Sequence, residues 1–392
     1  MKSHKKIGII TLQNGNNYGA MYQVYALSKY LENLGHEVIV INYDMVRDRS
    51  SLINYLKHPI AFYQKISANN ISIKSLFAQK KVIEKKRQRE KLFDAIFSEF
   101  RKNYLKITST EFTYEKLLSD CPTADAFICG SDQVWAADFF FSSPAFLLGF
   151  VSDNSKKISY AASFGKNKLE SYLQKIFKEN LKKFDAISVR EKSGLGIINE
   201  FSSLNATHVL DPTLLLSKSD YEEIIDYSLV PDTPYLFTYK LYQESKLSNW
   251  MSKTIEILSL QENLPVLFVS TNCPLRPNEK WKDLHPTPGQ LLGLIEKSSI
   301  FVTNSFHGTV FSIILKASFL CFARDIFEDK QNVRMEELLS SIELEELYCA
   351  PFLDTEAICK KLEYSYDYND VYKNLDTLRN SSVNFLEDAL SW

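Results

Sequence analysis

One segment of the sequence places candidate anion-binding and proton-transferring residues side by side: Thr303-Asn304-Ser305-Phe306-His307-Gly308-Thr309. It follows an apolar strand pattern and precedes a helical one, so we expect a turn between a strand's carboxyl end and a helix N-terminus. Free N–H groups and the positive end of the helix dipole make such a turn a site for anions. His307 can exchange protons near neutral pH, and Gly308 lets a ligand approach the backbone closely. This pattern predicts a catalytic His307 and anion binding by Asn304, Ser305, Gly308 and Thr309; the alternative is a capped loop with a structural histidine.

A second polar segment also follows a strand pattern: Cys129-Gly130-Ser131-Asp132-Gln133-Val134-Trp135. Its polar groups at Ser131, Asp132 and Gln133 can contact a hydroxylated ligand, and Trp135 can stack on a sugar ring. The alternative is a turn in which Ser131 or Asp132 caps a helix and the tryptophan belongs to the core.

The loop before the first expected helix is rich in amides and glycines: Gln13-Asn14-Gly15-Asn16-Asn17-Tyr18-Gly19. Asn16, Asn17 and Tyr18 suit contact with a polar, neutral ligand, and a loop that serves only the fold is the alternative. The loop is not G-x-G-x-x-G, and no P-loop pattern occurs anywhere in the sequence. These absences argue against a nucleotide-dependent dehydrogenase or kinase.

Three further residues are candidates because of their chemistry. Arg190, just past an expected strand, can hold a carboxylate or phosphate in bidentate geometry, and Arg334 invites the same interpretation. A structural ion pair is the alternative for Arg190. Asp211 is either a base or the N-cap of a turn. The other histidines have no metal-ligand spacing, so no metal site is predicted.

The elements that must position these residues follow from hydrophobic periodicity. Residues 6–12, 20–34 and 36–43 read as strand, helix and strand, which is a βαβ unit of a parallel sheet. Strand and helix patterns then alternate along the chain, with a break near residue 230. The prediction is an α/β protein of two Rossmann-like domains that face each other across a cleft. Their expected extents are 1–228, with a charged helical insertion at about 48–120; 229–370; and a C-terminal helix at 371–392 that packs back on the first domain.

Composition restricts the class of protein. The chain has 392 residues, of which 45% are hydrophobic and 24% charged, as in globular proteins. Its net charge of −2 argues against a nucleic-acid partner. The six cysteines form no C-x-x-C pair, and neither a signal peptide nor an 18-residue apolar stretch is apparent, so a cytoplasmic protein is expected. The basic run at 80–91 is interpreted as a solvated helix face, with contact to anionic lipid as the alternative.

Taken together, the motifs resemble those of the polysaccharide pyruvyl transferase family. The resemblance spans nearly the whole chain, and its motifs occur in the family's order: Asn17-Tyr18-Gly19-Ala20 with Gln23, Gly130-Ser131-Asp132-Gln133-Val134-Trp135, Ala162-Ser163-Phe164-Gly165, Ser188-Val189-Arg190-Glu191, Asp211-Pro212-Thr213 and Thr303-Asn304-Ser305-Phe306-His307-Gly308-Thr309. The sequence departs from the family at Ala136, where Asn is frequent.

The resemblance implies a glycosyltransferase-B-like fold and the transfer of the pyruvyl unit of phosphoenolpyruvate to a sugar as a ketal. The family's phosphoenolpyruvate site matches His307 and Arg190, and Asp132 and Asp211 are further candidates for proton transfer. The N-terminal domain would be the acceptor side, and the C-terminal domain would carry the donor site. The expected acceptor-binding residues lie in the amide-rich loop before the first helix and in the family's N-terminal motifs: Asn16, Asn17, Tyr18, Gln23, Ser131, Gln133 and Trp135.

Phosphoenolpyruvate is then the donor substrate, and no cofactor or metal is expected. The acceptor would be a sugar of a surface polysaccharide or a lipid-linked precursor, which would bring the protein to the inner face of the membrane. Two alternatives stay open from the sequence. One is a glycosyltransferase that uses a nucleotide sugar, and the other is a non-catalytic carbohydrate-binding relative.

Overall fold

The structure is a computed structural model. It describes residues 4–45, 79–136, 144–165, 168–241, 245–269, 278, 280–324 and 331–392. The first part of the predicted charged insertion, 48–78, therefore lies outside the described residues. So do the side chains of the first part of the basic run, up to residue 87.

The first sheet is formed by the N-terminal half of the chain and has six parallel strands in the order β2-β1-β3-β4-β5-β6. Their bounds are β1 (Lys6–Ile10), β2 (Glu37–Val40), β3 (Ala126–Cys129), β4 (Lys156–Ala162), β5 (Ala186–Val189) and β6 (Thr207–His208). All four residues of β3 are buried, as expected for a strand of a parallel sheet that helices cover on both faces.

The second sheet also has six parallel strands, in the order β12-β11-β10-β7-β8-β9. Their bounds are β7 (Leu236–Tyr239), β8 (Val266–Val269), β9 (Lys282–Asp283), β10 (Ile300–Thr303), β11 (Phe319–Phe322) and β12 (Tyr348–Cys349). The predicted α/β class with two Rossmann-like domains is confirmed. The edge strands β9 and β12 were not predicted, because two residues are too few to show a period.

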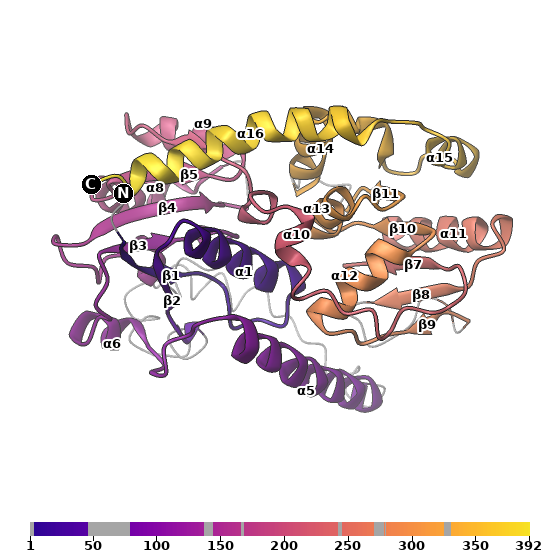
Figure 1. The fold of residues 1–392 in the computed structure, drawn as a ribbon, viewed down its shortest axis with the longest axis horizontal. Coiled ribbons are helices and arrows are strands. Elements are labelled where there is room, and N and C mark those ends of the chain that lie inside the picture. Colours follow the sequence, from indigo (N-terminus) through magenta and orange to yellow (C-terminus); the bar gives the residue numbers. More distant parts are fainter. Residues whose placement is uncertain are drawn as a thin grey trace.

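Helices cover the two sheets (Figure 1). Their bounds are α1 (Tyr18–Asn33), α5 (Gln79–Tyr104), α6 (Tyr114–Ser119), α8 (Ser171–Leu181), α9 (Lys192–Phe201), α10 (Lys218–Tyr221), α11 (Lys246–Gln261), α12 (Pro288–Lys297), α13 (Phe306–Leu315), α14 (Gln331–Ser341), α15 (Thr355–Leu362) and α16 (Tyr368–Ala389). The short 3-10 turns are η2 (Pro144–Leu147), η3 (Pro212–Leu214) and η4 (Glu345–Leu347). The domain boundaries predicted after residues 228 and 370 stay predictions.

Helix α1 lies between the two domains (Figure 1), and its residues from Tyr18 to Ser28 are all buried. The Tyr18 hydroxyl donates to Pro286 O at 2.6 Å, and the Tyr22 hydroxyl donates to Pro288 O at 2.7 Å. The Tyr22 ring also packs on Phe311 of α13, with 4.5 Å between ring centroids. We call these contacts of Tyr18 and Tyr22 the apolar joint. They explain why α1 is buried on more than the single face that its periodicity predicts.

Helix α5 also crosses to the second domain. Arg89 is 8% exposed and forms a bidentate ion pair with Asp283 of β9, with distances of 2.8 Å and 3.3 Å. Its guanidinium also lies 5.4 Å from the centroid of the Phe93 ring. At Arg89, therefore, the basic run is an interdomain contact and not the solvated face that the sequence predicts.

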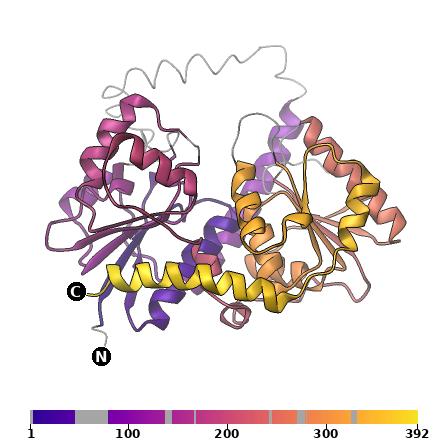
Figure 2. The same cartoon turned by 90° about the horizontal axis from the view of Figure 1, so that it is seen from above.

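The last helix, α16, runs from the second domain back along the first (Figure 2). Arg379 Nε donates to Leu214 O at 2.8 Å, and Ser382 Oγ accepts from Leu210 N at 2.9 Å. Leu210 and Leu214 lie on either side of Asp211 in the sequence. These two hydrogen bonds therefore fix the segment that carries Asp211 to α16.

Among the described residues, none of the helices combines the length and apolar character that crossing a membrane requires.

Candidate active site

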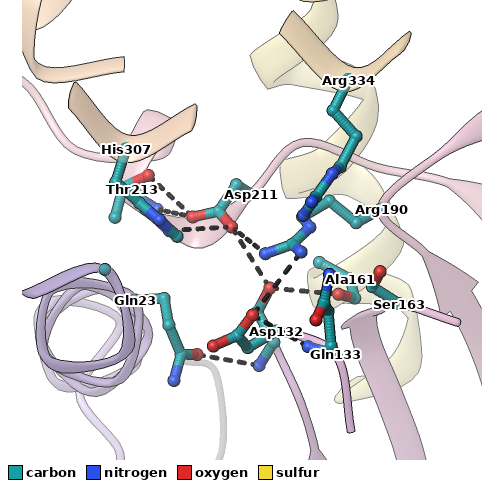
Figure 3. A network of polar contacts seen from close by, with 12 residues as sticks. Gln23, Asp132, Gln133, Ala161, Ser163, Arg190, Asp211, Thr213, His307 and Arg334 are labelled. Carbon is teal, nitrogen blue, oxygen red and sulfur yellow. Dashed lines mark hydrogen bonds and ion pairs between the residues drawn. The ribbon is translucent and has the colours of Figure 1, made fainter. Parts of the chain in front are cut away.

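Five charged side chains from both domains meet where the carboxyl ends of the two sheets approach each other (Figure 3). Asp132 follows β3, Arg190 follows β5 and Asp211 follows β6, all in the first domain. His307 comes from the first turn of α13 and Arg334 from α14, both in the second. We call these five residues the charged cluster. The sequence predicted each of them as a site residue, and the structure brings them together.

Arg190 is the centre of the cluster. Its side chain is only 2% exposed, and its guanidinium pairs with Asp211 at 2.9 Å, Glu191 at 3.1 Å and Asp132 at 3.6 Å. Burial lowers the pKa of Arg190, but the negative charges of Glu191, Asp211 and Asp132 outweigh burial and raise it above its ordinary value. Within the described structure, Arg190 Nη2 is a buried donor that has no hydrogen-bond partner. An ionised donor of this kind can still bind an anion.

Asp211 is fully buried and caps η3. One carboxylate oxygen accepts from the backbone and the hydroxyl of Thr213 at 3.0 Å and 2.7 Å. The other accepts from Arg190. Burial raises the pKa of Asp211, but His307, Arg190 and the Thr213 hydrogen bond together lower it well below its usual range. A carboxylate held ionised in this way is a poor proton acceptor near neutral pH. The geometry therefore makes Asp211 a counter-charge, in place of the predicted base.

His307 faces Asp211 across the domain interface. Its Nε2 lies 3.6 Å from Asp211 Oδ2, which is too far for a hydrogen bond. Nε2 is buried and has no hydrogen-bond partner among the residues that the structure describes. One ring nitrogen thus keeps its capacity to exchange a proton with a ligand, while a carboxylate stays close enough to stabilise the imidazolium.

Within the part of the chain that the structure describes, Arg334 has a weaker set of partners than Arg190. Among the described residues, the carboxylate that pairs with it is Glu191, at 3.8 Å, and its side chain is 10% exposed. Burial and the positive charge of Arg190 lower the pKa of Arg334 to about 10. Both guanidinium groups lie over Phe306, at 5.5 Å and 5.8 Å from the ring centroid. Two cations held on one aromatic ring beside a histidine favour an anionic ligand with more than one charged group.

A cavity of about 90 Å³ adjoins the cluster on the side of α14 and α16. Its walls are mixed, with polar groups beside leucines, and include Arg190, Asp211, Phe306, Arg334, His208 and Leu378. Both arginines therefore line a cavity beside the cluster.

The structure moves several predicted acceptor residues into the interior. Trp135 is fully buried, donates to Phe146 O at 3.1 Å and packs on Phe164, so it has a core position and no free face for a sugar. Tyr18 is likewise buried in the apolar joint. Because each aromatic group is enclosed by the protein, the predicted stacking role of Trp135 and the ligand contact of Tyr18 are corrected.

Gln23 and Ser131 are also fully buried, and they bond to each other. The Gln23 carbonyl accepts from Ser131 N at 3.0 Å, and its amide nitrogen donates to Thr11 Oγ1 at 3.0 Å. Ser131 Oγ donates to Ala161 O at 3.0 Å. These groups fix the turn that carries Asp132, in place of the predicted direct contact with an acceptor.

Asn16, Asn17 and Gln133 are the predicted acceptor residues that keep some exposure. Asn17 caps α1 and accepts from Gly19 N at 2.8 Å, and Asn16 donates to Asp94 at 2.5 Å. Gln133 lies beside Asp132 in the cluster (Figure 3). Of these three, Gln133 is the one that the picture places at the charged cluster.

In the predicted anion-binding turn, side chains of the turn itself already use some of the hydrogen-bonding groups. Ser305 Oγ accepts from Gly308 N at 3.3 Å, and Thr309 donates to Ser305 O at 3.1 Å. Asn304 bonds both backbone groups of Leu241 and thereby joins β10 to β7. Asn304, Ser305 and Thr309 therefore shape the turn. The anion-binding capacity of this segment rests on its remaining first-turn amides and on His307.

Glu191, Phe306 and Gly19 contact the cluster but were not predicted as site residues. Glu191 pairs with both arginines, both guanidinium groups lie over the Phe306 ring, and Gly19 of α1 lies against the His307 ring. All three sit inside motifs that the sequence singled out, but only the fold shows that they touch the cluster. In the described ranges, no group of three or more His, Cys, Asp or Glu side chains is placed to hold a metal ion.

The fold and this site together define a two-domain α/β protein whose charged cluster lies between the domains. The sequence model of the family described as Polysaccharide pyruvyl transferase matches residues 17–326. The matched part contains Asp132, Arg190, Asp211 and His307, and Arg334 lies beyond it. The chain belongs to this family and is an enzyme.

Solved structures show the same architecture. UDP-GlcNAc 2-epimerase from Methanocaldococcus jannaschii is 12% identical, with a TM-score of 0.51 and 92% of each chain covered. A Listeria monocytogenes protein assigned as a UDP-N-acetylglucosamine 2-epimerase is 9% identical, with a TM-score of 0.50, 96% of this chain and 91% of that chain covered. At this identity the likeness concerns the fold alone. A search of curated proteins found no match.

Proposed function

We propose that the enzyme transfers the pyruvyl unit of phosphoenolpyruvate to two hydroxyls of a sugar, forming a cyclic ketal and releasing inorganic phosphate. The observation that carries this proposal is the convergence of Arg190, Arg334 and His307 from two domains. Arg190 Nη2 and His307 Nε2 are buried and have no hydrogen-bond partner among the described residues. Phosphoenolpyruvate has a carboxylate and a phosphate ester attached to the same carbon, C2. Paired guanidinium groups match these two anionic groups.

The reaction needs a proton delivered to C3 and the attack of one sugar hydroxyl on C2. A second hydroxyl then attacks C2, and the C2–O bond to phosphate breaks. Two hydroxyl protons are released; one balances the proton added at C3, and the other leaves with the phosphate. In our proposal His307 exchanges these protons through Nε2, and Asp211 stabilises its imidazolium form. Asp132 is the further proton acceptor on the acceptor side.

The arginines act on charge and position. Arg190 and Arg334 hold the carboxylate and the leaving phosphate, whose negative charge grows as the C2–O bond breaks. Phosphoenolpyruvate supplies both the carbon unit and the leaving group, so we propose no additional cofactor or metal. Transfer from a nucleotide sugar is the competing function, and the low identity of the solved structures gives it no support beyond the fold.

The test is phosphate release from phosphoenolpyruvate with a panel of sugar acceptors. We expect acceptor-dependent release by the wild type and a turnover reduced by about 10²–10⁴-fold in His307→Ala, the usual contribution of a positioned acid–base group. Thermal melting of the same variant checks that it is folded. Turnover close to wild type in folded His307→Ala would remove His307 from the mechanism.

We further propose that the acceptor is a sugar of a surface polysaccharide or of its lipid-linked precursor, met at the inner face of the membrane. The basic run at 80–91 would supply the contact with anionic lipid. Flotation with vesicles containing an anionic phospholipid tests this part, and absence of binding at low salt would contradict it.

A further inference from the structure

The face of α1 that looks into the site carries Gly19 and Gln23, one helical turn apart. Gln23 holds the backbone of Ser131, and so places the turn that bears Asp132. Gly19 lies against the imidazole of His307 from the other domain. A Cβ atom built on Gly19 would lie 2.1 Å from His307 Nδ1, 2.7 Å from Cε1 and 2.8 Å from Cγ. All three distances are far below van der Waals contact.

The backbone of Gly19 does not itself require glycine. The residue lies in the first turn of α1 and is absent from the described glycines with positive φ, which are Gly35, Gly130 and Gly165. Glycine in a helix costs about 1 kcal/mol relative to alanine. The feature that makes glycine necessary at this position is therefore the space that the His307 ring fills.

Neither side of this contact can easily retreat. The hydroxyls of Tyr18 and Tyr22 fix α1 to the backbone of Pro286 and Pro288 in the second domain. On its other side, the His307 ring faces Asp211, which is fully buried and anchored by Arg190 and Thr213. A methyl group at position 19 would therefore overlap the imidazole and change its position relative to this carboxylate.

We propose that Gly19 is a positioning residue for His307, so that the N-terminal domain sets the geometry of the acid–base group carried by the C-terminal domain. This inference rests on the proposed role of His307 in catalysis. A displacement of about 1 Å can cost about 10²-fold in rate, which sets the size of the expected effect.

The substitution Gly19→Ala has a matched control in Gly196→Ala. Gly196 is also a helical glycine, in α9, and a Cβ atom there meets nothing within 4 Å. We expect Gly19→Ala to lower kcat for phosphoenolpyruvate-dependent phosphate release by about 10²-fold, with the KM for phosphoenolpyruvate nearly unchanged. Gly196→Ala should match the wild type.

A double-mutant cycle separates positioning from general damage. If Gly19 acts through His307, then Gly19→Ala causes no further loss of kcat in a His307→Ala background. Losses that multiply in the double mutant would overturn the proposal.

A measurement without substrate keeps this inference distinct from the proposed function. With selective glycine and histidine labelling, the ligand-free wild type should show a nuclear Overhauser contact between a Gly19 Hα and His307 Hε1. The His307 ring resonances should shift in Gly19→Ala and stay unchanged in Gly196→Ala. A wild type without this contact, or a His307 signal unmoved by Gly19→Ala, overturns the positioning role. If the contact between Gly19 and His307 is observed but the enzyme does not turn over phosphoenolpyruvate, the proposed function is rejected and the positioning role is not.

Discussion

The interface between the domains contains two regions of opposite construction. In the apolar joint, the Tyr18 and Tyr22 hydroxyls both have carbonyl partners and the Tyr22 ring is packed on Phe311. In the charged cluster, Arg190 and His307 keep buried polar atoms with no hydrogen-bond partner in the described structure. An arrangement that only stabilised the fold would be expected to satisfy these buried polar atoms with hydrogen bonds. We infer that the joint supplies stability and geometry, while the cluster is kept for ligand binding.

This contrast predicts that the largest loss of stability comes from the joint. Tyr22→Ala removes a buried ring and its hydrogen bond, and we expect it to lower the free energy of unfolding by about 3–5 kcal/mol. Tyr364→Ala, at a residue that is 37% exposed, is the matched control and should cost about 0.5 kcal/mol. Chemical denaturation measures both. Equal, small effects would mean that the joint does not hold the domains together.

The cluster should show the reverse behaviour. Arg334→Gln removes one charged donor, so we expect phosphoenolpyruvate to bind about 10- to 100-fold more weakly, the loss of one charge-assisted hydrogen bond. Because the lowered pKa of Arg334 shows that its surroundings disfavour the charge, the melting temperature should stay the same or rise. Lys175→Gln, at an exposed residue of α8, is the control. Weaker stability with unchanged affinity would make Arg334 structural.

Acid should act on the cluster through Asp211. Its pKa is lower in the folded protein than the ordinary value of about 3.9, so its ionised form stabilises the fold above that pH. This contribution is fully present at neutral pH and is lost as the pH falls from about 4 toward the folded pKa. Asp211→Asn should be less stable at pH 7 and should lose less stability on acidification. Unfolding curves from pH 7 to pH 2 that run parallel for the two proteins would contradict this.

Much of the fold follows from local pattern. The apolar runs before Gly130, Arg190 and Asn304 identify β3, β5 and β10, and these strands end within a residue or so of the predicted positions. The family resemblance is confirmed over residues 17–326. Because parallel strands present their carboxyl ends at one edge, the residues that follow these strands could be expected to meet.

The sequence could not predict the direction in which each side chain points. Asp132 has φ of 73°, and the chain turns there so that Asp132 faces the cluster while Trp135 enters the core. Both residues sit in one polar loop, and nothing local distinguishes them. The contact of Gly19 with His307 joins segments almost 300 residues apart, and it depends on how two domains dock.

The central claim is that the charged cluster binds phosphoenolpyruvate, and calorimetric titration of the ligand-free enzyme tests it most directly. The account predicts saturable binding of phosphoenolpyruvate at one site, weakened in Arg334→Gln, and no comparable binding of UDP-N-acetylglucosamine. Binding of the nucleotide sugar with no heat from phosphoenolpyruvate would contradict the account and would assign the cleft to glycosyl transfer.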